Sequence, residues 1–365
     1  YDKVPAGQQA MDKEVKEGSG VSGELERLVE ALHKLRNVDA YDDPEQPLLV
    51  ESKKAKGVAP TPPCSLRIRR QLRGHQGKVY AMDWGAADGN CLVSAAADGK
   101  VIVWNAFLQT KVHAIPLRSN WVMTCAFAPS QALVASGGLD NTCAIWTIPE
   151  GLGEYSKQSP HSELQKHDGY LSCCKFVDNS RILTGSGDKT CILWDIEKRA
   201  PLTVFKEHDS DVGCIDVHSN GTFISGSVDK MVMLYDYRKG SRVMSFPGHL
   251  ADVNDVAYFP NGDSFATASE DGSCRMWDIR AGRQIQRFYS DRNESPATCL
   301  SFSKTGTILF AGYDNNALVG WDTRRSSIAQ VMQGHDKRPS CMGIHPKGHA
   351  LCTGSWDGLL RIWAK

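Results

Sequence analysis

Residues 249–280 read HLADVNDVAYFPNGDSFATASEDGSCRMWDIR, and this stretch decides the fold. An acidic residue, Asp271, precedes an aromatic residue, Trp277, by six positions. Thr267 stands four positions before Asp271, and His249 stands 22 positions before it. Short apolar runs lie between glycine, asparagine and aspartate residues, a pattern that predicts short strands joined by tight turns.

The same spacing recurs seven times along the chain. Successive turn residues are separated by 42, 48, 41, 42, 44 and 42 positions, close to the period of about 40–45 residues in WD repeats. Five repeats carry the upstream histidine, and the second and sixth lack it. The histidines are His75, His167, His208, His249 and His335. The residues four positions before each turn residue are Ser94, Ser136, Thr184, Ser225, Thr267, Ala311 and Thr353. The turn residues and their aromatic partners are Asp98 and Trp104, Asp140 and Trp146, Asp188 and Trp194, Asp229 and Tyr235, Asp271 and Trp277, Asn315 and Trp321, and Asp357 and Trp363.

Each repeat reads as four short strands, and a single four-stranded sheet would leave both of its faces exposed. Seven such sheets bury their faces by stacking around an axis, so the sequence predicts an all-β, seven-bladed propeller, including the two atypical repeats. The histidine, the hydroxyl residue and the tryptophan can form a hydrogen-bonded chain behind the turn aspartate. A buried network of this kind requires every member to be satisfied. Because the pattern repeats around the ring, we interpret these residues as structural and not as catalytic triads.

Closure of the ring requires one further strand. The last repeat ends at Trp363, close to the end of the sequence, so its outermost strand has to come from elsewhere. Residues 66–72 alternate apolar and polar side chains and precede the first repeat histidine. We predict that this segment supplies the strand and removes an open sheet edge, so that the propeller spans residues 66–365.

Composition narrows the function classes. Lys plus Arg and Asp plus Glu both number 42, whereas nucleic-acid binders usually carry a basic stripe. No apolar run approaches the roughly 18 residues of a membrane span. The 12 cysteines are scattered along the chain and include no CxxC pair. We therefore expect buried free thiols in a reducing cytosol, and no metal or cofactor.

Residues 1–65, which precede the propeller, lack the repeat pattern. Residues 1–20 are expected to be disordered, and the proline-rich residues 37–65 to form an extended strap. Between them, residues 21–36 show the 4-3-4-3 spacing of a coiled-coil seam. A helix this short is marginal alone, so it requires a partner helix or docks on its own propeller. The seam consists of Val21, Leu25, Leu28, Leu32 and Leu35.

A coiled-coil helix ahead of seven WD repeats resembles the β subunit of heterotrimeric G proteins. The similarity spans residue 66 to the end and includes residues between the repeat signatures. Examples are LRGHQGKVYAMDW at 72–84, GYLSCCKF at 169–176, PNGDSFATASEDGSCR at 260–275 and TGSWDGLLRIW at 353–363. The resemblance implies a non-catalytic signalling protein that pairs with a γ subunit, binds GDP-bound Gα and engages effectors when released. It also implies a cytoplasmic location at the inner face of the plasma membrane, through lipidated partners.

A binding rim follows from geometry alone. The residue three positions after each histidine follows the loop that enters an innermost strand, and the residue before each turn aspartate lies on the same edge of the ring. Both sets surround the mouth of the central channel, and they mix aromatic, apolar and charged side chains as protein-binding hot spots do. They comprise Lys78, Tyr170, Asp211, Asp252 and Arg338, and Ala97, Leu139, Gly187, Val228, Glu270 and Trp356.

The family resemblance adds further positions to this rim. Lys100 and Lys111 match the side of the first blade that meets the N-terminal helix of Gα, with solvated charges as the alternative. Trp121, Met123 and Tyr80 can instead be packed residues of their blades. The positions that match the Gα contact surface are Lys78, Tyr80, Trp121, Met123, Leu139, Asn141, Tyr170, Asp211, Asp252, Asn254, Glu270 and Trp356. The chain departs from the family pattern at Ala97, Asn120, Gly213 and Val228, which puts the transfer of partner preferences in question.

The sequence bears on two other function classes. The segments Trp277-Asp-Ile-Arg280 and Trp321-Asp-Thr-Arg324 match the WDxR box that adaptors of cullin ubiquitin ligases read. A substrate receptor for such a ligase is therefore the alternative function. A propeller enzyme is not expected, because the sequence has no HExxH, GxSxG or phosphate-loop motif.

Overall fold

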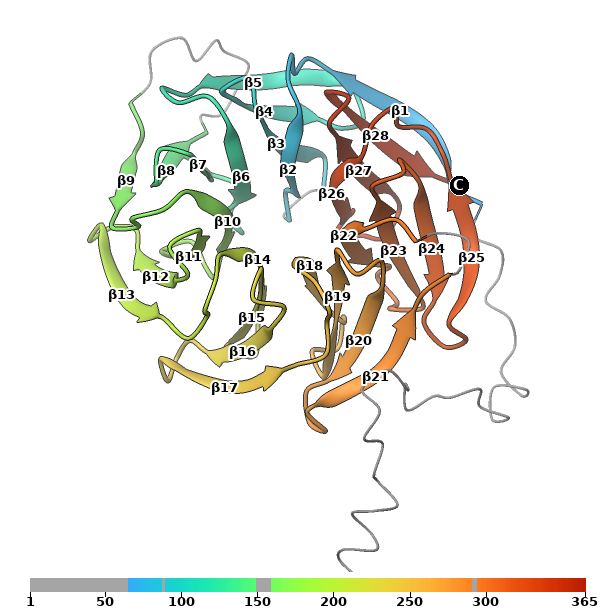
Figure 1. The fold of residues 1–365 in the computed structure, drawn as a ribbon. Helices are drawn as coiled ribbons and strands as arrows, with labels where there is room; N and C mark the ends of the chain where they lie inside the picture. The colour runs from blue at the N-terminus through green and yellow to red at the C-terminus, as the bar shows by residue number, and fades with distance from the viewer. Residues whose placement is uncertain (1–64, 87–88, 149–158, 291–293) are drawn as a thin grey trace, which may run out of the picture. The chain divides into compact units, whose positions relative to one another are not determined.

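The computed structural model describes residues 65–86, 89–148, 159–290 and 294–365. Its strands form seven four-stranded sheets arranged in a ring (Figure 1), which confirms the predicted propeller. The predictions for residues 1–20, for the helix at 21–36 and for the strap up to residue 64 lie outside the described residues.

Each blade contributes one strand to the lining of the central opening and three further strands outward. The innermost strands are β2 Val79–Trp84, β6 Val122–Phe127, β10 Leu171–Phe176, β14 Val212–His218, β18 Val253–Tyr258, β22 Ala297–Phe302 and β26 Pro339–Ile344. The second strands are β3 Cys91–Ala96, β7 Leu133–Gly138, β11 Arg181–Ser186, β15 Thr222–Ser227, β19 Ser264–Ser269, β23 Ile308–Tyr313 and β27 Leu351–Ser355. The third strands are β4 Lys100–Asn105, β8 Thr142–Thr147, β12 Cys191–Asp195, β16 Val232–Asp236, β20 Cys274–Asp278, β24 Leu318–Asp322 and β28 Leu359–Ala364. The outermost strands are β5 Thr110–Pro116, β9 Ser162–Gln165, β13 Ala200–Phe205, β17 Ser241–Phe246, β21 Arg283–Phe288, β25 Ser327–Met332 and β1 Arg67–Arg73. We number the blades 1 to 7, from β2–β5 to β26–β28 with β1.

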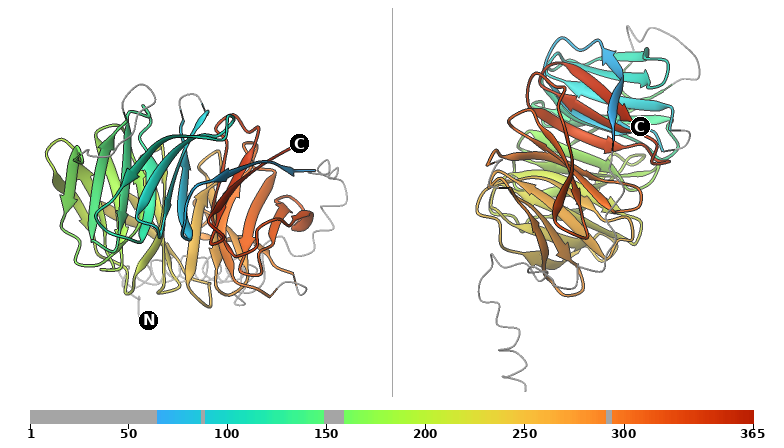
Figure 2. Two further views of the ribbon diagram at one scale, coloured as in Figure 1. Left: turned by 90° about the horizontal axis from the view of Figure 1, so that it is seen from above. Right: turned by 90° about the vertical axis from the view of Figure 1, so that its right-hand side faces the viewer.

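The ring closes with a strand from the start of the described chain, as the sequence predicts. β1 pairs antiparallel with β28, from Arg67 opposite Ala364 to Arg73 opposite Leu359. The blue β1 runs beside the red C-terminal strands in Figure 1 and in both views of Figure 2. Leu72 of β1 is fully buried, so the latch also contributes to the core. The seventh blade therefore has four strands and no open edge at the junction.

Hydrophobic cores lie between neighbouring blades, which explains why the sheets have to stack. One core joins Leu92 and Trp104 of blade 1 to Ile362 of blade 7. Another joins Val101 of blade 1 to Val134 of blade 2. Because each sheet buries both faces against its neighbours, every blade depends on the next one for its core.

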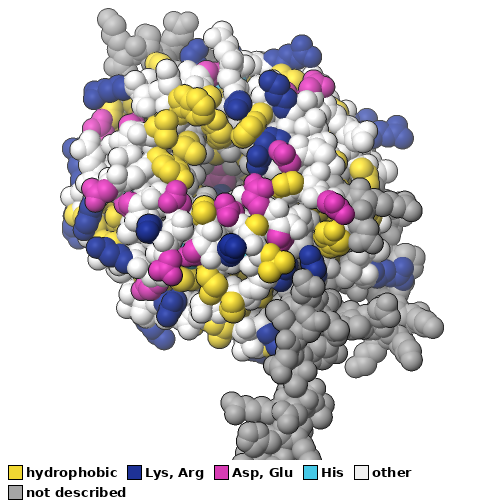
Figure 3. Space-filling model, viewed as in Figure 1, with side chains coloured by type: hydrophobic (Ala, Val, Ile, Leu, Met, Phe, Trp, Pro, Cys, Tyr) yellow, Lys and Arg dark blue, Asp and Glu magenta, His cyan; other side chains and the backbone are white. Residues whose placement is uncertain are grey.

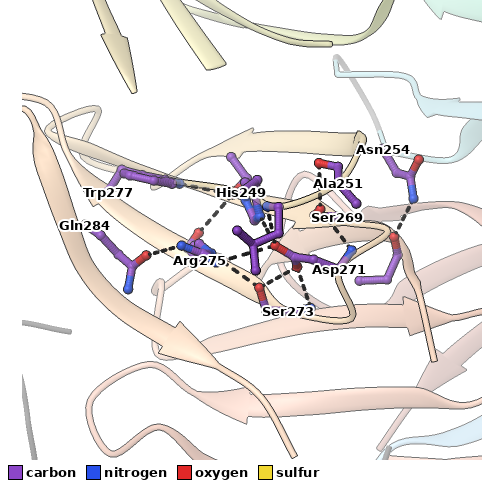
Figure 4. Close-up of polar contacts among 12 residues, drawn as sticks. His249, Ala251, Asn254, Ser269, Asp271, Ser273, Arg275, Trp277 and Gln284 are labelled. Carbon is purple, nitrogen blue, oxygen red and sulfur yellow. Dashed lines mark hydrogen bonds and ion pairs between the residues drawn. The ribbon is translucent and has the colours of Figure 1, made fainter. Parts of the chain in front are cut away.

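A chain of hydrogen bonds stands behind each complete turn, as Figure 4 shows for blade 5. The indole Nε1 of Trp277 donates to Oγ1 of Thr267 at 3.0 Å, and Nε2 of His249 lies 2.6 Å from the same oxygen. Nδ1 of His249 lies 2.8 Å from the carboxylate of Asp271. Burial lowers the pKa of His249, so the neutral ring accepts from Thr267 and donates to Asp271. The same histidine geometry recurs in blades 1, 3, 4 and 7. In blade 4 Tyr235 replaces the tryptophan, and its hydroxyl donates to Sδ of Met233 at 3.2 Å. The predicted hydrogen-bonded chain behind the turn aspartate is thereby confirmed.

The chain of hydrogen bonds should hold its turn in place, and blade 2 provides a matched control. We expect Asp188→Ala to lower the free energy of unfolding by about 1–3 kcal/mol, because it leaves His167 and Thr184 without their anchor. Asp140→Ala, in the blade without the histidine, should change it by less than about 0.5 kcal/mol. Thermal and denaturant unfolding of both variants measures the difference. Equal destabilisation by the two substitutions would contradict a role for the histidine network.

The same pair of variants makes a prediction about pH. Burial alone would raise the pKa of Asp188, but hydrogen bonds from Thr190 and His167 outweigh it and hold the pKa below its ordinary value. A carboxylate with a lowered folded-state pKa contributes stability above the unfolded pKa of about 3.9, and this stability is lost as pH falls further. The stability difference between wild type and Asp188→Ala should therefore narrow between pH 5 and pH 3. A difference in unfolding free energy that stays constant between pH 5 and pH 3 would contradict this role of the Asp188 carboxylate.

The thiols of the described residues are all free, as expected. Most are buried, and burial raises their pKa, for example to about 11 for Cys174 and about 12 for Cys274. A thiol with so high a pKa holds its proton at neutral pH and behaves as a small apolar side chain.

Candidate protein-binding rim

One edge of the ring carries the predicted site, and we call this edge the rim. It consists of the connections that enter the innermost strands and the turns that join the second to the third strands. Figure 3 shows this face: hydrophobic side chains gather beside the central opening over β2 and β6, and acidic side chains lie nearer β14 and β18. The rim is thus chemically divided into two sides.

A β-bulge in every innermost strand shapes the rim. In each blade the pairing with the second strand shifts just after the first residue, as between Val79 and Ala81 in β2. The extra residue leaves the ladder and is re-aimed. The seven bulge residues are Tyr80, Met123, Ser172, Gly213, Asn254, Thr298 and Ser340. The sequence analysis found Tyr80, Met123 and Asn254 only through the family resemblance and missed the device that places them.

Four bulge residues join neighbouring blades. Their side chains donate to a backbone carbonyl of the next innermost strand, as Ser340 does to Val79 at 2.6 Å and Asn254 to Ala297 at 2.8 Å. Thr298 and Ser172 do the same, with Pro339 and Val212. Tyr80, Met123 and Gly213 make no such bond among the described residues. Two of these three, Tyr80 and Met123, are consecutive around the ring, and their side chains remain available to the surface.

Tyr80 lies at the centre of an aromatic group. Its ring stacks on Trp121 with centroids 6.1 Å apart and meets Trp356 edge-on at 6.3 Å. Trp121 is 47% exposed, so the alternative that it is a core residue is wrong. It precedes β6 and has φ of 63°, a conformation that costs a non-glycine residue energy. This backbone turns a large aromatic side chain toward the solvent beside Tyr80.

Trp356 is covered by two cations. The Nζ of Lys78 lies 3.8 Å from its ring centroid, and the guanidinium of Arg338 lies at 4.7 Å. Arg338 is in turn 3.3 Å from the carboxylate of Asp314. Such cation–π contacts contribute about 0.5–1 kcal/mol at exposed sites and fix the direction of the charges. Sequence reasoning named Lys78 and Trp356 for the site, but it missed Asp314.

The other side of the rim is acidic. The hydroxyl of Tyr170 donates to the carboxylate of Asp211 at 2.9 Å, and burial together with this bond raises the pKa of Tyr170 to about 12. The backbone N–H of Glu270 donates to the carbonyl of Asp252 at 2.9 Å, which ties two further acidic residues together. Asn254 donates to Glu270 at 3.2 Å. This side presents fixed negative charge to the solvent.

The remaining predicted residues fall into two groups. Leu139 is 51% exposed at the tip of the β7–β8 turn, next to Asn141, which donates to the carbonyl of Asp168 at 3.3 Å. Lys100 and Lys111 lie on β4 and β5 of blade 1, away from the innermost strands. Lys111 is exposed, and its Nζ donates to the carbonyl of Gly74 at 3.4 Å. The structure thus separates these two lysines from the residues at the mouth. The departures from the family pattern, Ala97, Asn120, Gly213 and Val228, all lie on rim connections, turns or bulges.

Two further features of the described residues bear on function. They include no group of three or more His, Cys, Asp or Glu side chains arranged to hold a metal ion. They also include no helix with the length and hydropathy of a membrane span. Arg280 and Arg324 of the two WDxR segments are exposed in the turns after β20 and β24, on the edge of the ring opposite the rim.

Comparison with known proteins agrees with this architecture. A family model described as G protein beta WD-40 repeat protein matches residues 23–364. The chain is 46% identical to a guanine nucleotide-binding protein G(I)/G(S)/G(T) subunit beta-1 of Homarus americanus over 343 residues, which cover 93% of this chain and 99% of the relative. The chain belongs to the G protein β-subunit family. The β subunits of Nicotiana tabacum and Arabidopsis thaliana are 41% and 43% identical to it, over 83% and 81% of this chain. The resemblance noted from the sequence is therefore confirmed, and no enzyme family is among these relatives.

Proposed function

We propose that this β-family chain pairs with a γ subunit and holds GDP-bound Gα on the rim. The observation that carries the proposal is the partly exposed cluster of Tyr80, Trp121 and Trp356, flanked by the cations of Lys78 and Arg338. Partly exposed aromatic residues that are held in place by neighbours are the usual anchors of protein interfaces. The acidic side, with Asp211, Asp252 and Glu270, complements it by fixing the orientation of the partner.

Release follows from differential binding. A nucleotide bound to Gα can free the β chain only if it changes the surface that the β chain contacts. GTP would therefore act by remodelling the segments of Gα that cover the rim. The freed rim is then open to effectors, which compete for the same anchors. Attachment to the membrane would come from the lipid of the partner subunits.

A matched pair of substitutions tests whether the rim is the interface. Leu139 on the rim is 51% exposed, and Val243 on β17 at the outside of the ring is 52% exposed. We expect Leu139→Asp to weaken binding of GDP-bound Gα at least about tenfold, because it places an unpaired charge in an apolar contact. Val243→Asp should leave the affinity unchanged. Calorimetric titration measures both, and equal affinities for the two variants would contradict the proposed interface.

A further inference from the structure

Blade 2 contains a site that five of the other six blades fill with their own histidine. Arg118 stands at the position of the repeat histidine, four residues before the innermost strand, as His75 does in blade 1. Arg118 is exposed and does not replace the imidazole in the hydrogen-bonded chain. The rest of the chain is in place, because Nε1 of Trp146 donates to Oγ of Ser136 at 2.9 Å, as the corresponding tryptophans do elsewhere.

A hollow of about 260 Å³ occupies this part of the blade. It is far larger than a water molecule, whose share of the liquid is about 30 Å³. The hollow is partly open, and residues 117–121 of the rim connection before β6, Trp121 among them, form part of its wall. Its lining includes Arg118, Trp121, Ser136, Asp140, Trp146 and Glu163.

In the sixth blade, which also lacks the histidine, another side chain of the same blade occupies the space. There Tyr313 is buried, and its hydroxyl accepts from Nε1 of Trp321 at 3.1 Å. The residue at the same position in blade 2 is Gly138, two residues after the hydroxyl position. A Cβ on Gly138 would lie 2.2 Å from the carbonyl oxygen of Trp121, so no side chain fits there. Blade 2 therefore lacks both the histidine and its replacement.

The groups around the hollow retain the donor and acceptor that an imidazole needs. Ser136 is 1% exposed, and among the described residues its hydroxyl proton has no acceptor. Among the described residues, the only hydrogen bond that the Asp140 carboxylate accepts comes from the backbone N–H of Thr142, at 3.4 Å. In blades 3 and 7 the corresponding groups lie 2.7–2.8 Å from the two ring nitrogens of a histidine. Neutral imidazole carries one N–H donor and one acceptor, whereas ammonium and guanidinium groups carry donors only.

We propose that the hollow in blade 2 is a binding site for an imidazole side chain, which a partner on the rim inserts beside Trp121. Its N–H would donate to Asp140, its second nitrogen would accept from Ser136, and its ring would pack against Trp146. The indole of Trp146 offers the contact that His75 makes with Trp104 at 6.2 Å between ring centroids. The part of this proposal that concerns the partner rests on the proposed function, since it assumes a protein bound on the rim.

The site can be tested on the protein with its γ partner and 4-methylimidazole, the analogue of a histidine side chain. Saturable binding to wild type is expected, with a Kd on the order of 1 mM as befits so small a ligand. Arg118→His should place the protein's own imidazole in the hollow, raise Tm by about 2 °C and abolish the binding. Arg118→Gln leaves the hollow open and should bind as wild type does. Asp140→Ala removes the acceptor and should weaken binding at least tenfold.

The outcomes separate the site from the proposed function. Absence of saturable binding to wild type, or equal binding to wild type, Arg118→His and Asp140→Ala, overturns the site. For the partner, Arg118→His should weaken binding of GDP-bound Gα at least tenfold, and Arg118→Gln should not. If Arg118→His binds GDP-bound Gα with unchanged affinity, the proposal that the partner inserts a histidine is wrong, and the proposed rim interface is unaffected. Failure of wild type to bind Gα counts against the proposed function, and the titration with 4-methylimidazole still decides the site.

Discussion

Replacing Trp121 and Trp356 together by alanine is expected to weaken binding of GDP-bound Gα by at least about 100-fold. Each side chain offers a large aromatic surface on the rim, and truncation of such anchors often costs about 2 kcal/mol or more. Both rings contact Tyr80, Trp121 by stacking at 6.1 Å and Trp356 edge-on at 6.3 Å, so their effects should not add simply. Trp356→Ala also releases Lys78 and Arg338 from the ring that directs them.

The control for this variant is a pair of exposed apolar residues elsewhere on the ring. Leu202 and Val243 are 47% and 52% exposed on the outermost strands β13 and β17. Their double alanine variant should bind Gα as wild type does. Both variants should unfold at nearly the wild-type temperature, because none of the four side chains is in the core. A loss of less than threefold in the tryptophan variant would contradict the rim as the source of affinity.

Replacing Leu28 and Leu32 by glutamate should abolish co-purification of a γ-like chain. Both residues belong to the predicted seam, which is too short to be stable without a partner helix. Charges at seam positions prevent the two helices from packing. Affinity capture followed by mass spectrometry measures the loss.

Arg27→Glu with Lys34→Glu provides the matched control for the seam. In the predicted helix these two residues fall at positions outside the seam, so the γ-like chain should be retained. Equal loss in both variants would indicate an effect of charge on the region as a whole. A stable, monodisperse wild type without any partner chain would contradict the pairing.

The fold could be predicted in detail because its signal is repeated. The spacing of residues such as Asp271 and Trp277 fixes a strand and a turn, and seven repetitions remove the ambiguity that a single repeat leaves. The latch by β1 followed from the lack of a fourth strand in the last repeat. The hydrogen-bonded chain of each turn followed from the residue types alone, because a buried histidine needs both of its nitrogens satisfied.

The candidate site could be predicted only in part. Positions such as Leu139 and Trp356 followed from the place of the turns, but the bulge that re-aims Tyr80 leaves no mark on the alternation of β2. The left-handed backbone of Trp121 could not be predicted from the sequence either, because tryptophan rarely adopts this conformation and tertiary contacts impose it. The pairing of Arg338 with Asp314 joins two blades and depends on distances that no repeat spacing encodes.

The hollow in blade 2 is another feature that the sequence alone did not predict. The sequence showed that the histidine was absent, yet the sixth blade lacks it too and fills the space with Tyr313. Whether a missing residue leaves room depends on the backbone around Gly138, which only the three-dimensional structure reveals.

The most direct measurement is the affinity of the wild-type chain, co-expressed with a γ subunit, for Gα in two nucleotide states. The account predicts tight binding of the GDP form and binding at least about 100-fold weaker of the form loaded with a non-hydrolysable GTP analogue. That ratio corresponds to a difference of about 2.7 kcal/mol between the two surfaces presented to the rim. Equal affinity for the two forms would contradict the proposal that the rim holds and releases Gα.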